Sequence, residues 1–180
     1  MQVGTIDLRT LLTADPLGYR VVRLAFNPAS GAILAVMAAT EATTSRRRLF
    51  RRTLADPAYE EILAPSDACE FADVLVCESA ALAFASVRTI TPSVEYVLYA
   101  LDLLHGNALV EVPPPHDSSG ERLWLADLLS ASHDGSCIYL TVGTQSTGND
   151  GSVSINYFVA RMTASTGEIV RLARLASPYS

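Results

Sequence analysis

Short apolar runs alternate with turn-forming residues along most of the chain. The runs are strand-sized and are bounded by Gly, Pro, Asn or Ser, a pattern typical of β-strands. The expected strands span Tyr19–Phe26, Ala32–Ala39, Arg46–Thr53, Glu60–Ala64, Glu70–Val76, Ala80–Val87, Val94–Leu103, Leu109–Val112, Leu123–Ser130, Cys137–Val142, Ile155–Met162 and Glu168–Leu175. They fall into groups of four, which predicts an all-β protein of four-stranded antiparallel units.

Three segments also fit a helix, so an α+β fold with an antiparallel sheet is the alternative. Asp56–Leu63 begins with an N-cap residue, a proline at the first helical position and acids in the first turn. Glu95–Leu104 spaces its apolar residues at helical intervals, and Leu123–Leu129 is similarly ambiguous. The β-branched and aromatic start of Val94–Leu103 favours a strand there.

One short phrase recurs along the chain. Ser132–Tyr139 (SHDGSCIY) is a turn that leads into an apolar strand, Asn27–Ala35 (NPASGAILA) is similar, and Glu78–Phe84 (ESAALAF) is a weaker copy. The spacings are 48 and 56 residues, measured between Gly31, Ser79 and Gly135. Such a period is typical of stacked β-units. In these turns we expect Asp to accept a hydrogen bond from the backbone two residues on, and Gly to adopt a positive φ.

The phrase resembles the S-P-D-G-x-x-[IL]-A signature of TolB-like and WD-type β-propeller blades. In that family the turn joins a blade's innermost strand to the next, and a later [YF]-x-x-D-x-x-x-G signature joins the third strand to the outer one. Leu98–Asn107 is similar to the second signature, as is Tyr157–Glu168, which has Thr163 where Asp is expected. The resemblance implies β-propeller-like blades of four antiparallel strands, with function carried by their loops.

About three blades are expected in a single β-repeat domain over residues 1–180, with approximate repeats 19–65, 66–115 and 116–176. Closed propellers have about four to eight blades, and three would leave sheets uncovered. We therefore expect either a fragment of a longer propeller or a homodimer that completes a ring, unless the blade count differs. Residues 1–18 are interpreted as a closing strand, Val3–Leu8, followed by a turn.

The composition is that of a folded domain, with 49% hydrophobic residues and a mean hydropathy of +0.26. The net charge of −6 argues against a general nucleic-acid binder. No apolar run approaches the roughly 18 residues of a membrane span, and the amino terminus lacks a signal-peptide pattern. Three cysteines without a C-x-x-C pair indicate free thiols. We expect a cytoplasmic protein that does not associate with membranes.

One basic segment contrasts with this acidic background. It holds five of the 13 arginines, namely Arg46, Arg47, Arg48, Arg51 and Arg52. On a strand, Arg46, Arg48 and Arg52 would face one way and Arg47 and Arg51 the other, which suggests an edge or outer strand. These arginines are the candidate binding residues for an acidic partner, phosphate or RNA. The alternative is a solvated charged strand that protects a sheet edge.

Residue types used in catalysis and metal binding form no recognisable motif. His133 precedes Asp134, but the turn phrase already explains the aspartate as a backbone cap. His105, His116 and His133 lack the spacing of metal ligands. We therefore predict no catalytic, metal or cofactor site.

The function expected from the sequence is that of a non-catalytic module that binds a protein partner or another ligand. One alternative is the propeller part or accessory domain of a hydrolase or peptidase. Another is a polyanion binder that uses the Arg46–Arg52 strand.

Overall fold

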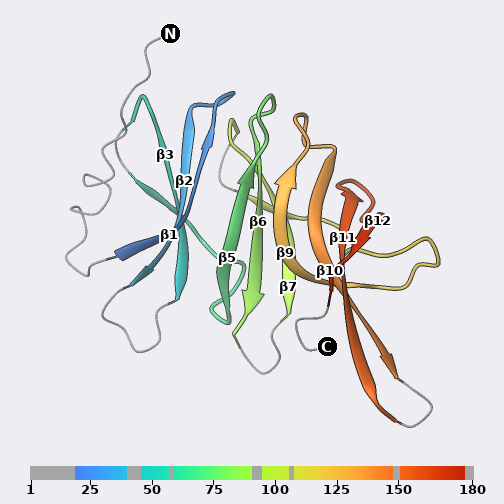
Figure 1. Cartoon of the computed structure of the whole chain (residues 1–180). Helices are drawn as coiled ribbons and strands as arrows, with labels where there is room; N and C mark the ends of the chain where they lie inside the picture. The colour runs from blue at the N-terminus through green and yellow to red at the C-terminus, as the bar shows by residue number, and fades with distance from the viewer. Residues whose placement is uncertain are drawn as a thin grey trace.

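The computed structural model describes residues 19–39, 46–56, 59–90, 95–105, 108–147 and 151–176, where all strands lie in three sheets of four (Figure 1). The first sheet contains β1 (Tyr19–Asn27), β2 (Ala32–Ala39), β3 (Arg47–Thr53) and β4 (Glu60–Ile62). The second contains β5 (Cys69–Val76), β6 (Leu82–Thr89), β7 (Tyr96–Asp102) and β8 (Leu109–Glu111). The third contains β9 (Trp124–Ala131), β10 (Cys137–Thr147), β11 (Val153–Thr163) and β12 (Ile169–Arg174). The all-β prediction, with four-stranded antiparallel units, is confirmed.

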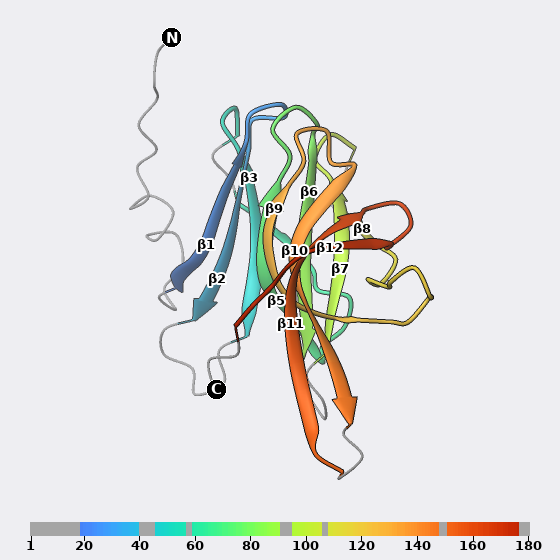
Figure 2. The ribbon, with the colours of Figure 1, turned by 45° about the vertical axis from the view of Figure 1, so that its right-hand side comes forward.

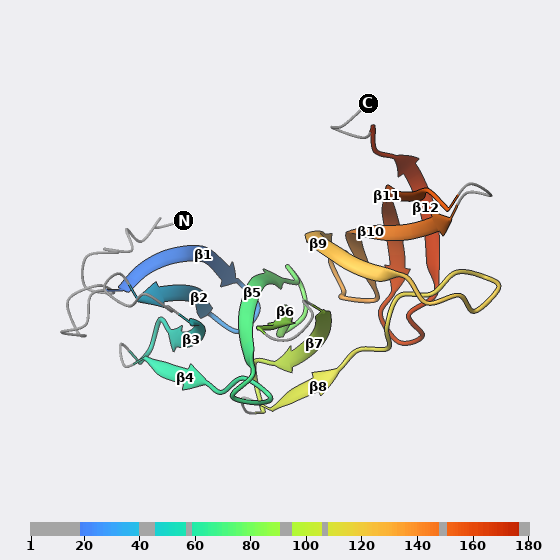
Figure 3. The same cartoon turned by 90° about the horizontal axis from the view of Figure 1, so that it is seen from below.

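Each sheet is a meander, because consecutive strands are neighbours and pair antiparallel. The first strands of the sheets lie together, since β5 packs against both β1 and β9. The later strands fan away from this row, so the sheets are arranged like blades with the second between the other two (Figure 3). Among the described residues, no helix is long and apolar enough to cross a membrane. The predicted closing strand, residues 1–18, lies outside the described residues.

The helical alternative is wrong, and β7 shows why its sequence is ambiguous. Leu98 and Leu101 have helical spacing, but they point to opposite faces of the second sheet. Leu98 joins the core shared with the third sheet, and Leu101 joins the core shared with the first. A strand buried on both faces loses the simple alternation of apolar and polar residues that would identify it. Leu123–Leu129 likewise contributes most of β9 rather than a helix.

The hairpin of β10 and β11 is longer than predicted. The expected strands end at Val142 and begin at Ile155, but Gln145 pairs with Ile155 and Thr147 with Val153. The two strands are also joined by a hydrogen bond between the hydroxyls of Ser146 and Ser154, 2.6 Å apart. The hairpin projects beyond the other strands (Figure 2).

Two apolar cores fill the spaces between the sheets. The first and second sheets meet through Leu34, Val36, Leu49, Phe71, Val74 and Ala85. The second and third sheets meet through Phe84, Leu98, Leu128, Leu140, Val142 and Met162. Because both faces of the second sheet are covered, β6 is an almost continuous run of buried residues.

The recurring phrase forms the turn between the first and second strand of every sheet. Gly31 and Gly135 have φ values of +68° and +78°, as predicted. At Gly135 a side chain would also collide with Leu82, since a Cβ there would lie 2.7 Å from its Cδ2. Strand pairing makes Asn27, Cys77 and Ser132 equivalent, each opposite the residue five positions later. Gly31 and Gly135 lie at different distances along the chain from these equivalent positions. The repeat spacing measured from the glycines is therefore inexact.

Neighbouring turns are hydrogen-bonded to one another. The buried Asn27 amide donates to the carbonyls of Cys77 at 2.6 Å and Ala80 at 2.8 Å, in the turn of the second sheet. Its carbonyl oxygen accepts from the backbone N–H and the hydroxyl of Ser30, both at 2.8 Å. In the second turn, the Ser79 N–H and hydroxyl donate to the His133 carbonyl at 3.1 and 2.9 Å. Hydrogen bonds therefore fix the spacing of all three sheets at this end.

Replacing Asn27 by Ala should lower the free energy of unfolding by about 2–4 kcal/mol, because several buried groups lose their partner at once. Urea denaturation monitored by circular dichroism measures the change. Asn156→Ala is the matched control, since Asn156 makes an exposed contact with Arg174. That variant should change stability by less than about 0.5 kcal/mol. Equal effects of the two substitutions would contradict the tethering role of Asn27.

Asp134 caps the turn of the third sheet. Its carboxylate accepts from the Ser136 N–H at 3.0 Å and from the hydroxyls of Ser132 and Ser136, both at 2.8 Å. These hydrogen bonds, the Ser136 N–H first, lower the pKa of Asp134 from 3.8 to about 2. The expected bond from the backbone two residues on is confirmed.

The lowered pKa of Asp134 predicts a specific acid sensitivity. Its contribution to stability is complete above the unfolded-state pKa and is lost as the pH falls from about 4 to about 2, when the native carboxylate becomes protonated. Asp134→Asn has no charge to titrate, so its melting temperature should fall less steeply over this interval than that of the wild type. Thermal melts at a series of pH values test this, and parallel curves would refute it.

Candidate functional site

The arginine segment lies on β3 and immediately before it. β3 is flanked by β2 and β4, so the expectation of an edge strand is wrong. The predicted alternation of its faces is confirmed by its pairing with β2. Arg51 shares with Leu49 the face that packs on the second sheet, whereas Arg48 and Arg52 lie on the opposite face. The five arginines therefore do not form one surface.

The arginines nearest the start of β3 are accompanied by acids. Arg46 Nη1 lies 3.6 Å from Asp67 Oδ1, and Arg48 Nη1 lies 3.4 Å from Glu61 Oε2. All four residues line a hollow of about 500 Å³ beside β4. Its charge is therefore mixed, whereas a polyanion is attracted by a surface of uniformly positive charge.

The later arginines of the segment make contacts within the protein. Arg51 Nη2 donates to the Leu103 carbonyl at 2.5 Å and so connects the first sheet to the second. Arg52 donates to the Tyr59 hydroxyl at 3.3 Å, and its guanidinium lies over the tyrosine ring, 5.6 Å from the centroid. These contacts hold both side chains against the protein.

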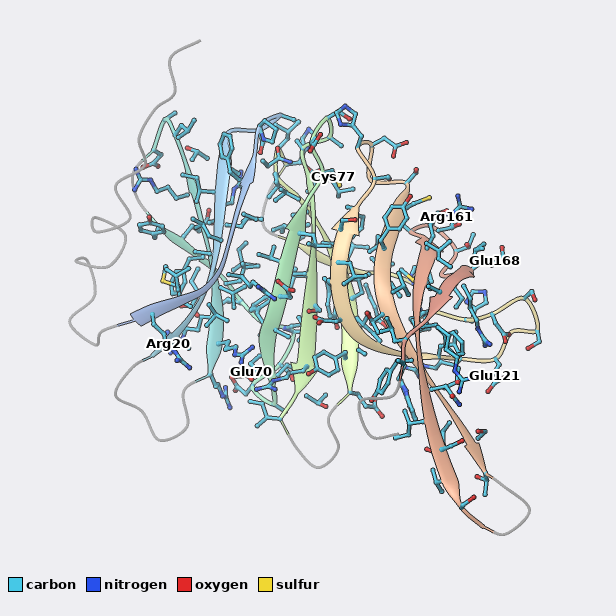
Figure 4. All side chains as sticks on the ribbon, in the orientation of Figure 1. Arg20, Glu70, Cys77, Glu121, Arg161 and Glu168 are labelled. Atoms are coloured by element: carbon cyan, nitrogen blue, oxygen red, sulfur yellow. The ribbon has the colours of Figure 1, made fainter. Side chains whose placement is uncertain are left out.

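Glu70, which the sequence analysis did not single out, joins the sheets at the end opposite the turns. Its buried carboxylate accepts from Arg88 Nε at 2.5 Å and from the Arg47 backbone N–H at 2.9 Å. The hydrogen bond to Glu70 raises the pKa of Arg88, so the guanidinium stays charged. Figure 4 shows Glu70 at the lower end of β5. A carboxylate committed to both sheets has a structural role.

The three histidines lie at separate turns. Nδ1 of His105 is 2.9 Å from Asp102, Nδ1 of His116 is 3.2 Å from the Pro114 carbonyl, and Nδ1 of His133 is 3.3 Å from Glu78. In the described part of the chain, no three His, Cys, Asp or Glu side chains come together as a metal site. His133 contacts Glu78 rather than the Asp134 carboxylate, so this pair has no geometry of a catalytic dyad in the structure.

A cleft of about 740 Å³ lies between the second and third sheets. Its walls come from the start of β7, the end of β8 and the segment that leads into β9. Its lining combines carboxylates and a guanidinium with aromatic residues, namely Glu95, Glu111, Arg122, Tyr96, Trp124 and Tyr157. Two carboxylates against one guanidinium make the cleft acidic.

The proline-rich segment that forms one wall of the cleft is held in place. His116 pairs with the turn between β11 and β12, donating its N–H to the Gly167 carbonyl at 3.0 Å. Gly167 has a φ of +80°, and a Cβ there would lie 2.4 Å from the Pro114 carbonyl oxygen, so only glycine permits this approach. Asp117 also lies 3.5 Å from Arg171 of β12. The sequence gives no local signal for the cleft, because its walls meet only through these distant contacts.

No family model and no curated protein matches this chain.

The thiols of the three cysteines are free. Cys77 is fully buried in the core between the second and third sheets. Burial, with a smaller effect of the Asp134 charge, raises the pKa of its thiol to about 11. Cys69 and Cys137 are partly exposed. Since the thiolate is the nucleophile, Cys77 is not suited to nucleophilic chemistry near neutral pH.

A thiol titration of the native protein should reflect this difference. At pH 8, Cys77 should resist a thiol-reactive disulfide reagent that modifies all three thiols of the unfolded protein. Peptide mapping identifies the protected residue, and Cys77→Ala should leave the number of reactive native thiols unchanged. Rapid modification of Cys77 in the folded protein would contradict its burial.

Proposed function

We propose that this protein is a non-catalytic binding module, and that its acidic cleft receives a basic segment of a protein partner. The observation that carries the proposal is the joint lining of the cleft by carboxylates and aromatic rings. Carboxylates form strong hydrogen bonds with arginine, and aromatic faces attract cations. The chain's net charge of −6 would add long-range attraction for a basic partner.

The position of the cleft also supports this proposal. Its walls are strand ends and a segment that hydrogen bonds hold in place, so the cleft is built on fixed elements of the fold. A site on rigid elements loses little conformational entropy when a partner binds. Aromatic and arginine contacts in such clefts often dominate the energy of protein interfaces.

The polyanion hypothesis is the second candidate and concerns a different surface. It is less well supported, because Arg46 and Arg48 lie beside acids and Arg51 and Arg52 contact the protein itself. Retention on heparin that decreases steeply with salt, and is abolished by Arg48→Ala, would favour it over the cleft.

The single tryptophan, Trp124, lies in the cleft lining and offers a direct readout of binding. Titration with an oligo-arginine peptide should change its fluorescence, whereas oligo-glutamate should not. Glu95→Gln with Glu111→Gln should weaken peptide binding about tenfold, equivalent to ~1.4 kcal/mol. The same charge change in Glu60→Gln with Glu78→Gln, outside the cleft, is the matched control. Equal weakening by both double variants, or no binding, would refute the cleft as the site.

A further inference from the structure

One row of charged residues runs across the first strands of the three sheets. Arg23 lies opposite Val36, Asp73 opposite Ser86, and Asp127 opposite Thr141. In each case the partner is the fifth residue of the sheet's second strand, so the three charges occupy equivalent positions. The row therefore contains one cation followed by two acids.

Neighbouring members of this row interact. Arg23 Nε lies 3.1 Å from Asp73 Oδ1, an ion pair that bridges the first and second sheets. Burial raises the pKa of Asp73, Arg23 lowers it, and the charge of Asp127 raises it again. Asp127 therefore lies close enough to influence Asp73. Among the ion pairs formed by the described residues, none includes Asp127.

The two ends of the stack expose apolar residues at positions that are buried inside it. Leu24 of β1 is 44% exposed, whereas Val74, its equivalent on β5, is 4% exposed because the first sheet covers it. Phe26 is also exposed, on the same outer face as Leu24. At the other end, Trp124 and Tyr157 are exposed on the outer face of the third sheet, opposite Gly143.

We propose that two copies of this chain associate head to tail, the third sheet of each covering the first sheet of the other. Asp127 of one copy then meets Arg23 of the next, in the same relation that Arg23 has to Asp73 within a chain. Arg23 can receive this second carboxylate because its side chain is 58% exposed beside Asp73. Two such contacts close a ring of six sheets, within the range of about four to eight found in closed propellers.

The partner that covers the exposed Leu24 and Phe26 of the first sheet and the outward face of the third is a second copy, because the charges of the row are complementary in this order. Asp127 lies on the outward face of the third sheet, and Arg23 occupies the equivalent first-strand position on the face of the first sheet that packs on the second, where its side chain is still 58% exposed. Contact between two third sheets would place the Asp127 carboxylates of the two copies together, which is unfavourable at an interface. Contact between two first sheets would leave Asp127 of both copies without a cation.

Light scattering coupled to size exclusion, over a wide range of protein concentrations, tests the assembly. The wild type should have twice the mass of the 19.3 kDa chain. Asp127→Arg should raise the dissociation constant at least about tenfold, and Leu24→Ser should do the same. The matched controls are Asp67→Arg and Leu104→Ser, which change exposed residues away from the two end faces and should leave the dimer intact.

A mixing experiment tests the charge pairing itself. Asp127→Arg and Arg23→Asp chains should each be monomeric, but an equimolar mixture should regain the dimer because both of its contacts are then complementary. Circular dichroism and melting curves establish that each variant is folded.

If Arg23→Asp does not fold, the dissociation constants of the Asp127→Arg and Leu24→Ser variants test the proposed dimer instead. A wild type that stays monomeric, a mass that grows beyond two copies, or an Asp127→Arg dimer as stable as the Asp67→Arg dimer would overturn the proposal. Trp124 and Tyr157 belong both to the cleft lining and to the outward face of the third sheet, so variants outside this overlap separate the two proposals: Glu95→Gln with Glu111→Gln should leave the dimer intact, and Asp127→Arg should leave peptide binding intact.

Discussion

The hydrogen bonds between neighbouring turns determine how the three sheets stack. A four-stranded meander has two broad faces and cannot bury either alone, so each sheet depends on its neighbour for a core. The Asn27 amide makes this neighbour relation specific, because its two donors reach two carbonyls of the next turn while its oxygen holds its own turn. With the turns joined, the first strands are aligned and the apolar faces meet in register.

The first and second sheets make polar contacts at three places along their length, and an apolar core fills the space between these contacts. Asn27 lies at the turn end, Arg23 and Asp73 pair along the first strands, and Glu70 binds the Arg47 backbone at the opposite end. Buried polar groups of this kind add little net stability, but a misaligned sheet would leave them without partners. The apolar core drives the association of the sheets, and these groups select one alignment.

The strands and turns could be predicted because their signals are local. Alternation, turn residues and the recurring phrase identified elements whose positions agree closely with the structure, and the cap at Asp134 followed from its place in the phrase. The cleft, the Glu70 contacts and the Asn27 tether could not, since they join residues far apart in sequence. Asn27 bonds carbonyls 50 and 53 residues away, and nothing in its own turn reveals them. The leucines of β7 misled because the second sheet is buried on both faces.

The repeats have diverged in a way that makes the two ends of the stack unlike. β2 is an almost continuous run of residues that are buried within the single chain, as is β6, so Ile33, Ala35 and Met37 on the side of β2 away from the second sheet are already covered. β10 instead alternates buried Ile138, Leu140 and Val142 with partly exposed Tyr139 and Thr141. A continuous apolar run is typical of strands covered on both faces, whereas alternation is typical of strands with one wet face. Unlike ends suit a heterologous contact, in which different surfaces meet, and an interface between identical surfaces would not require the first and third sheets to differ.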